Sequence, residues 1–141
     1  MEQAAKEKRS GLKTRATAIF IAVFIGIWLS GMTASLTAGA CRNDLNEGAK
    51  KLRFCTISLS AGAWMKAFPI ERAKGAIIHL ERGIALHQIG QNDKARAAFD
   101  KALHDSRAKQ GAWEQGLHQR MAQLDDPKAL ALWVSVAGAA D

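Results

Sequence analysis

Charged residues are missing from one stretch of this 141-residue chain, Ala16 to Ala40. Catalytic signatures are missing too, because the sequence contains no HExxH motif, no phosphate-binding loop and no glycine-rich nucleotide motif. From Asp44 onward no alternating apolar and polar pattern persists for more than a few residues, which argues against β-strands. We therefore predict an all-α protein that is not an enzyme and has no catalytic, cofactor-binding or metal site.

The four histidines support this prediction because none is well placed for chemistry. His79 and His87 are eight positions apart, about 12 Å along one helix, which is too far to share a metal ion. His104 precedes Asp105, but no nucleophile accompanies the pair. We interpret the histidines as ordinary helix-surface residues. Two charged pairs are interpreted as solvated helix faces, namely Glu81 with Arg82 and Asp100 with Lys101.

The net charge of +7 is distributed in a way that suggests membrane topology and not nucleic-acid binding. Residues 1–15 contribute +3, since five basic residues there oppose Glu2 and Glu7. A basic flank before an apolar segment is retained in the cytoplasm, so residues 1–15 form a predicted cytoplasmic head. Residues 41–141 contribute the other +4, with fifteen Lys or Arg against eleven Asp or Glu. These charges are mixed along the chain, without the basic stripe that nucleic acid requires.

The uncharged stretch has two competing interpretations. A membrane-spanning helix needs about 20 apolar residues, and we place it at residues 16–38. A cleaved signal peptide would also fit, because Ile19 to Leu29 has the length of a signal core and Ala38-Gly39-Ala40 is a small-x-small cleavage site. A lipoprotein signal ending at Cys41 is a weaker alternative, since Ala38 stands where Leu is usual. We favour a retained anchor, with the remaining chain on the periplasmic side of a bacterial inner membrane.

Small residues recur every four positions within the predicted anchor. Ala18, Ala22, Gly26 and Ser30 would form one ridge of a helix, and a second, bulky stripe of aromatic residues has the same spacing. Such small-xxx-small faces let helices approach closely in lipid, which predicts packing on the helices of partner subunits. The series continues outward to Ala34 and Ala38, but small residues are so abundant in that half that we attribute this continuation to composition.

The two cysteines, Cys41 and Cys55, both follow the apolar segment. In an oxidising compartment such a pair predicts a disulfide. A helix beginning at Leu45 would place Cys55 about 15 Å along its axis, so Cys41 must run back alongside that helix to reach it.

Helical segments are predicted throughout residues 41–141. Asp44 and Glu47 are interpreted as a capping box that opens a helix to about Ser60. Pro69 is expected at the first position of a long helix that Gly90 ends. Three further helices are expected at residues 92–106, at residues 112–124 and from Pro127 onward, the last capped by Asp126.

Apolar residues of these helices recur with a period of about 34 positions. Ala95 and Ala129, and likewise Phe99 and Trp133, are 34 apart, whereas Gly83 and Gly116 are 33 apart. This period is typical of tetratricopeptide helix–turn–helix repeats. The chain resembles short exported bacterial tetratricopeptide-like proteins through the following residues: Cys41, Cys55-Thr56, Arg82-Gly83, Gly90, Ala95, Phe99 and Ala102-Leu103. Arg107 replaces the usual closing proline.

The resemblance implies a repeat core and a protein-binding role. The expected core residues are Gly83, Gly90, Ala95, Phe99, Ala102, Trp113 and Trp133. Two repeats are few for a solenoid, so a cap or a partner is needed. Trp64 and Phe68 lie in a connection and are candidates for contact with lipid headgroups or a partner. The predicted function is a membrane-anchored interaction module, an accessory or assembly subunit of a membrane complex; the alternative is a soluble periplasmic adaptor released by signal cleavage.

Overall fold

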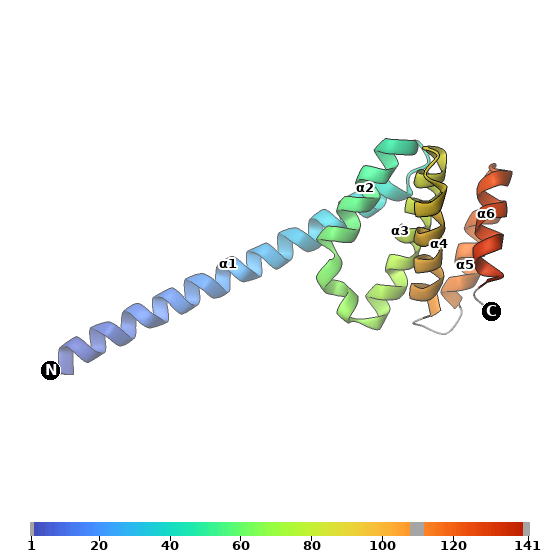
Figure 1. Cartoon of the computed structure of the whole chain (residues 1–141). Helices are drawn as coiled ribbons and strands as arrows, with labels where there is room; N and C mark the ends of the chain where they lie inside the picture. The colour runs from blue at the N-terminus through green and yellow to red at the C-terminus, as the bar shows by residue number, and fades with distance from the viewer. Residues whose placement is uncertain (1, 108–111, 140–141) are drawn as a thin grey trace. The chain divides into compact units, whose positions relative to one another are not determined.

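Helices joined by short turns make up the part of the chain that the structure describes. The computed structural model describes residues 2–107 and 112–139, which contain helices and no strand. The helices are α1 (Glu2–Arg42), α2 (Gly48–Ala61), the 3-10 helix η1 (Ala63–Ala67), α3 (Pro69–Gln88), α4 (Asn92–Ser106), α5 (Ala112–Ala122) and α6 (Pro127–Ala137) (Figure 1). The all-α prediction is therefore confirmed.

The chain divides into two compact units. The first ends at Met32 and contains most of α1, and the second begins at Thr33 and contains the end of α1 and all later helices. The second unit thus begins earlier than Cys41, the predicted start of the helical domain. The ten residues from Thr33 to Arg42 belong to both the apolar helix and the folded domain.

In the first unit, α1 exposes large apolar side chains in every direction. Ten of them are between 46 % and 74 % exposed, namely Ile19, Phe20, Ile21, Val23, Phe24, Ile25, Ile27, Trp28, Leu29 and Met32. A helix that is apolar all round requires a nonaqueous environment. The stretch Arg15–Arg42 is long and apolar enough to cross a membrane. Signal sequences share these properties, so length and composition alone do not distinguish an anchor from a signal.

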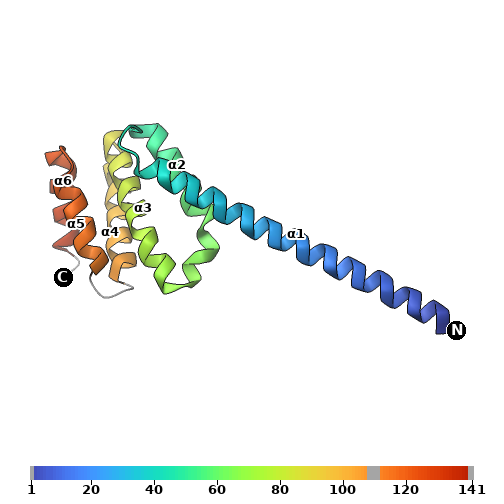
Figure 2. The ribbon, with the colours of Figure 1, turned by 180° about the vertical axis from the view of Figure 1, so that it is seen from behind.

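In the second unit, α3 is the central helix. It packs against α2, η1, α4 and α5, and Figures 1 and 2 show α3 to α6 side by side. The reason lies in its sequence, which places apolar residues on all sides of the helix. Its buried apolar residues are Ala73, Ala76, Ile78, Leu80, Ile84, Ala85 and Leu86. On α4, in contrast, the buried apolar residues form one face, at Ala95, Ala98, Phe99, Ala102 and Leu103.

The α3–α4 and α5–α6 hairpins meet through two aromatic rings. Phe99 and Trp133 lie edge to face, with ring centroids 5.6 Å apart and planes at 89°, a favourable arrangement. The indole N–H of Trp133 donates to His118 Nδ1 at 3.1 Å. Phe99 also lies directly over Gly83, where an added Cβ would come within 2.4 Å of its ring. Only glycine allows this close crossing of α3 and α4.

Two other predicted core residues, Trp113 and Gly90, and the predicted repeat partner of Gly83 have different positions. Trp113 is 37 % exposed and therefore lies outside the core. Gly90 is exposed and has a φ of +76°, so it ends α3 through a left-handed turn. Gly116 is exposed, with no atom within 4 Å of an added Cβ, so it does not repeat the close crossing at Gly83.

The structure confirms two of the predicted helix starts and contradicts a third. Pro69 begins α3, and Asp126 caps α6 by accepting from the backbone N–H groups of Lys128 and Ala129. The predicted capping box at the start of α2 is wrong. Glu47 forms no side-chain capping hydrogen bond, and Asp44 instead pairs with Arg120 of α5.

Candidate functional site

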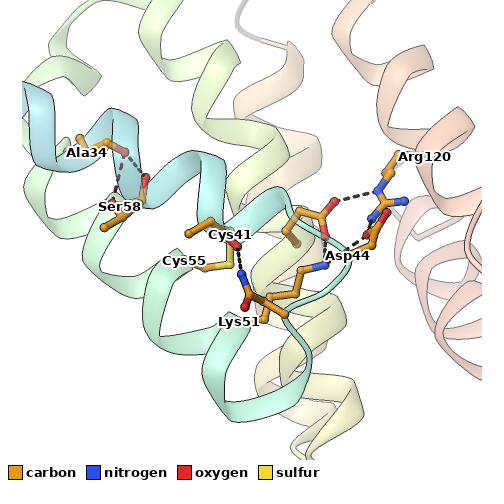
Figure 3. Close-up of a disulfide and its surroundings, with 11 residues drawn as sticks. Ala34, Cys41, Asp44, Lys51, Cys55, Ser58 and Arg120 are labelled. Atoms are coloured by element: carbon orange, nitrogen blue, oxygen red, sulfur yellow. Dashed lines mark hydrogen bonds and ion pairs between the residues drawn. A yellow bond between two sulfur atoms is a disulfide. The ribbon is translucent and has the colours of Figure 1, made fainter.

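A disulfide joins the end of α1 to α2. Cys41 and Cys55 are fully buried, with their Sγ atoms 2.06 Å apart, at disulfide distance as the sequence predicts. The loop between the helices reverses the chain, so α2 runs back along α1 (Figure 3). Asn46 in this loop donates from Nδ2 to the carbonyl oxygen of Ala40 at 2.8 Å. The disulfide and this hydrogen bond therefore attach the end of α1 to the rest of the domain.

Small residues let α1 and α2 approach closely above the disulfide. Ala34 is only 4 % exposed, and its carbonyl oxygen accepts a hydrogen bond from Ser58 Oγ at 3.0 Å (Figure 3). An added Cβ on Gly62 would lie 3.6 Å from the Ala34 Cβ. Ala38 packs against the two cysteines. The outer small residues therefore have a packing role, and their attribution to composition was wrong.

The inner small residues have a different environment. In the first unit, Ala18 and Ala22 are exposed, and an added Cβ on Gly26 would meet nothing within 4 Å. Their predicted role in packing on partner helices stays a prediction.

A network of charged side chains, with Lys51 and Glu81 buried at its centre, joins α2, α3 and α5. Lys51 Nζ lies 2.6 Å from Glu81 Oε2, and their side chains are 3 % and 2 % exposed. Arg120 Nε lies 2.7 Å from the other oxygen of Glu81 and also pairs with Asp44 (Figure 3). Hydrogen bonding to Glu81 raises the pKa of Arg120, which therefore remains charged. The expectation that Glu81 is solvated was wrong, because α3 is surrounded by other helices.

A buried pair of polar side chains, His79 and Asp105, lies between α3 and α4. His79 Nε2 lies 3.6 Å from Asp105 Oδ2, and both side chains are buried. Burial, followed by the nearby charge of Lys66, lowers the pKa of His79 to about 4, with smaller contributions from Lys101 and Arg82. Burial also opposes ionisation of Asp105, but hydrogen bonds from Lys101 and His104 outweigh it and lower the Asp105 pKa. The expectation of a surface histidine was wrong at His79.

The hydroxyl next to this buried pair in the sequence is not accessible. Ser106 follows Asp105, but it is fully buried and its hydroxyl donates to the carbonyl oxygen of Leu103 at 2.7 Å. Among the described residues, no group of three or more His, Cys, Asp or Glu could hold a metal ion. The buried charges therefore hold helices together. One sequence signal could have located them, because Glu81 and His79 lie on a helix that carries apolar residues on every side among its charged ones.

An open groove of about 400 Å³ runs along the end of α1. Its walls come from α1, α2, η1 and α3, and Trp113 lines one part of it. Ala38, Leu59 and Ile78 supply apolar surface. Its charged lining residues are Arg42, Lys66, Glu71 and Lys74.

Two exposed aromatic residues lie beside the groove lining in sequence. Trp64 is 47 % exposed and Phe68 is 59 % exposed, on either side of the lining residues Met65 and Lys66. Comparison of the chain with protein-family models, with curated proteins and with solved structures finds no match.

Proposed function

We propose that this protein is a non-catalytic interaction module held in a bacterial inner membrane by α1. The basic residues 1–15 would remain in the cytoplasm, and the disulfide-bonded helical domain would lie in the periplasm, where disulfides persist. Its role is that of an accessory or assembly subunit, whose partners are other membrane-protein subunits. The exposed apolar surface of the α1 segment supports this proposal.

One observation favours a retained anchor over a cleaved signal peptide. The last part of the apolar segment is built into the domain, since Ala34 is buried and accepts a hydrogen bond from Ser58. Cleavage after Ala40 would remove Ala34 and Ala38 and expose Ser58 and the disulfide. Loss of a packed helix end costs stability, because its buried apolar surface would return to water. Retention of the segment keeps the domain intact.

The binding surface follows from the helical hairpins. We propose that α3–α4 and α5–α6 are two tetratricopeptide-like repeats, stacked through Phe99 and Trp133. The close crossing at Gly83 supports this proposal, and the open position at Gly116 shows where the second pair departs from the pattern. Repeats of this kind bind proteins on the surfaces that stacking leaves exposed. Trp64 and Phe68, which are both exposed, are proposed as further contacts for lipid headgroups or a partner.

The mass of the native protein tests the anchor. Intact-mass measurement and N-terminal sequencing of protein recovered from membranes should find residues 16–40 still attached. Alkaline extraction should leave the protein in the membrane pellet. A chain that begins at Cys41 and appears in the soluble fraction would instead establish the periplasmic adaptor.

A paired substitution tests packing of the anchor on partner helices. Ala22→Ile with Gly26→Ile would fill the ridge of small residues and should reduce recovery of partner subunits in mild detergent. Phe24→Ile with Trp28→Ile is the matched control, because these positions lie about 200° around the helix from the ridge. Equal recovery with both paired variants would refute packing through the ridge.

A further inference from the structure

We propose that the groove beside α1 binds an anionic phospholipid of the outer leaflet of the same membrane. This inference rests on the proposed anchor and adds a specific ligand to it. The groove is about 400 Å³ in volume, within the range of about 300–1,000 Å³ that is usual for small-molecule sites. Its chemistry has two parts, an apolar surface and an excess of positive charge.

The location of the groove favours a ligand from the bilayer. Ala34, Ser35 and Ala38 form one wall, and all three belong to the outer end of the apolar stretch Arg15–Arg42. With α1 retained as an anchor, this wall lies where the helix leaves the membrane. Gly62, at the end of α2, lines the groove next to Ala34, so η1 begins at the same level. Exposed Trp64 on η1 is of the type enriched at membrane interfaces.

The charges of the groove favour an anionic headgroup. Lys74 Nζ is paired with Glu71 at 2.7 Å. Within the described part of the chain, neither Arg42 nor Lys66 forms an ion pair, so both cations are available to a ligand. A phosphodiester with a neutral or negative headgroup matches these two cations. Phosphatidylglycerol is the probe that presents this chemistry.

The apolar surface favours a hydrocarbon chain over a protein helix. Leu59, Ile77 and Ile78 contribute this surface together with Ala38. A partner helix is about 10 Å wide, so a volume of 400 Å³ would hold only about one helical turn. An extended acyl chain is much thinner and can follow the groove while its headgroup reaches Arg42 and Lys66.

Two glycines provide a test that leaves folding intact. Gly75 lines the groove and Gly116 does not, and an added Cβ would meet nothing within 4 Å at either position. Gly75→Leu should therefore fill the groove, and Gly116→Leu is its matched control on another helix. Both substitutions should also favour their helices, since leucine has a higher helix propensity than glycine.

The measurement is native mass spectrometry of the full-length protein in detergent, with phosphatidylglycerol or phosphatidylcholine added. The wild type and Gly116→Leu should retain phosphatidylglycerol in preference to phosphatidylcholine. Gly75→Leu, and the double variant Arg42→Gln with Lys66→Gln, should each retain about tenfold less. Circular dichroism of each variant confirms that it is folded.

Several results would overturn the lipid site. Equal retention by Gly75→Leu and the wild type, equal retention of the two lipids, or retention of neither lipid would each refute it. If the protein survives alkaline extraction in the pellet and binds neither lipid, the lipid site fails while the anchor stands. If the native chain begins at Cys41, the wall formed by Ala34 to Ala38 is lost, and anchor and lipid site fail together.

Discussion

Substitution of Gly83 by alanine should destabilise the helical domain, although alanine is the better helix former. The gain in helix propensity is about 1 kcal/mol. Against it, the new Cβ would lie 2.4 Å from the ring of Phe99, about 1 Å inside an ordinary contact. Phe99 is fully buried and edge-on to Trp133, so the ring has no space into which to move. Overpacking of this kind costs about 3 kcal/mol, which leaves a net loss of about 2 kcal/mol.

Thermal and urea unfolding of the full-length protein in detergent measure this loss. For a unit of this size, 2 kcal/mol corresponds to a fall in Tm of about 10 °C. Gly116→Ala is the matched control, because its Cβ meets no atom within 4 Å and the substitution keeps only the gain in propensity. The control should therefore be more stable than the wild type by up to about 1 kcal/mol. If Gly83→Ala were as stable as Gly116→Ala, the close crossing of α3 and α4 would be refuted.

Three further predictions concern buried groups. The free energy of unfolding of the domain should fall by up to about 3 kcal/mol as the pH falls from 6.5 to 4. In this range His79 binds a proton in the unfolded chain but not in the folded one, where its pKa is lowered. His79→Leu should reduce this loss in urea titrations at several pH values. Glu81→Ala should cost about 3–5 kcal/mol in the same assay, since it leaves two cations without their shared carboxylate. Reduction of Cys41–Cys55, whose sequence separation is 14, should lower the free energy of unfolding by about 3 kcal/mol.

Each of these predictions has a distinct contrary result. If the pH dependence of stability were unchanged in His79→Leu, a group other than His79 would be responsible for it. A Glu81→Ala domain of wild-type stability would show that the charge network is dispensable. Free thiols in the native protein, found by mass spectrometry without reductant, would refute the disulfide.

Local patterns in the sequence were sufficient for the helices and for several of their ends. Pro69, Gly90 and Asp126 act through the backbone of their own helix, so short-range geometry determines their roles. The all-α class follows for the same reason, since helical hydrogen bonds join residues close in sequence. The cysteine pair was also predictable, because only one pairing exists for two cysteines.

Only the tertiary structure decided which charged residues are buried. Glu81 meets Lys51 and Arg120, which are 30 and 39 positions away, and no local pattern determines such distances. Likewise, Trp113 and Trp133 have the same residue type, but one is exposed and the other lies under Phe99. The packing partner of each helix decides these outcomes.

In the apolar stretch at the start of the chain, too, some properties follow from composition and others from the fold. Its composition alone determined that residues 16–38 could enter a membrane. The fold decided that Ala34 and Ala38 pack on α2 and belong to the domain. The physical reason is that hydrophobicity is a property of the side chain itself, whereas burial depends on the neighbours that the rest of the chain brings to it.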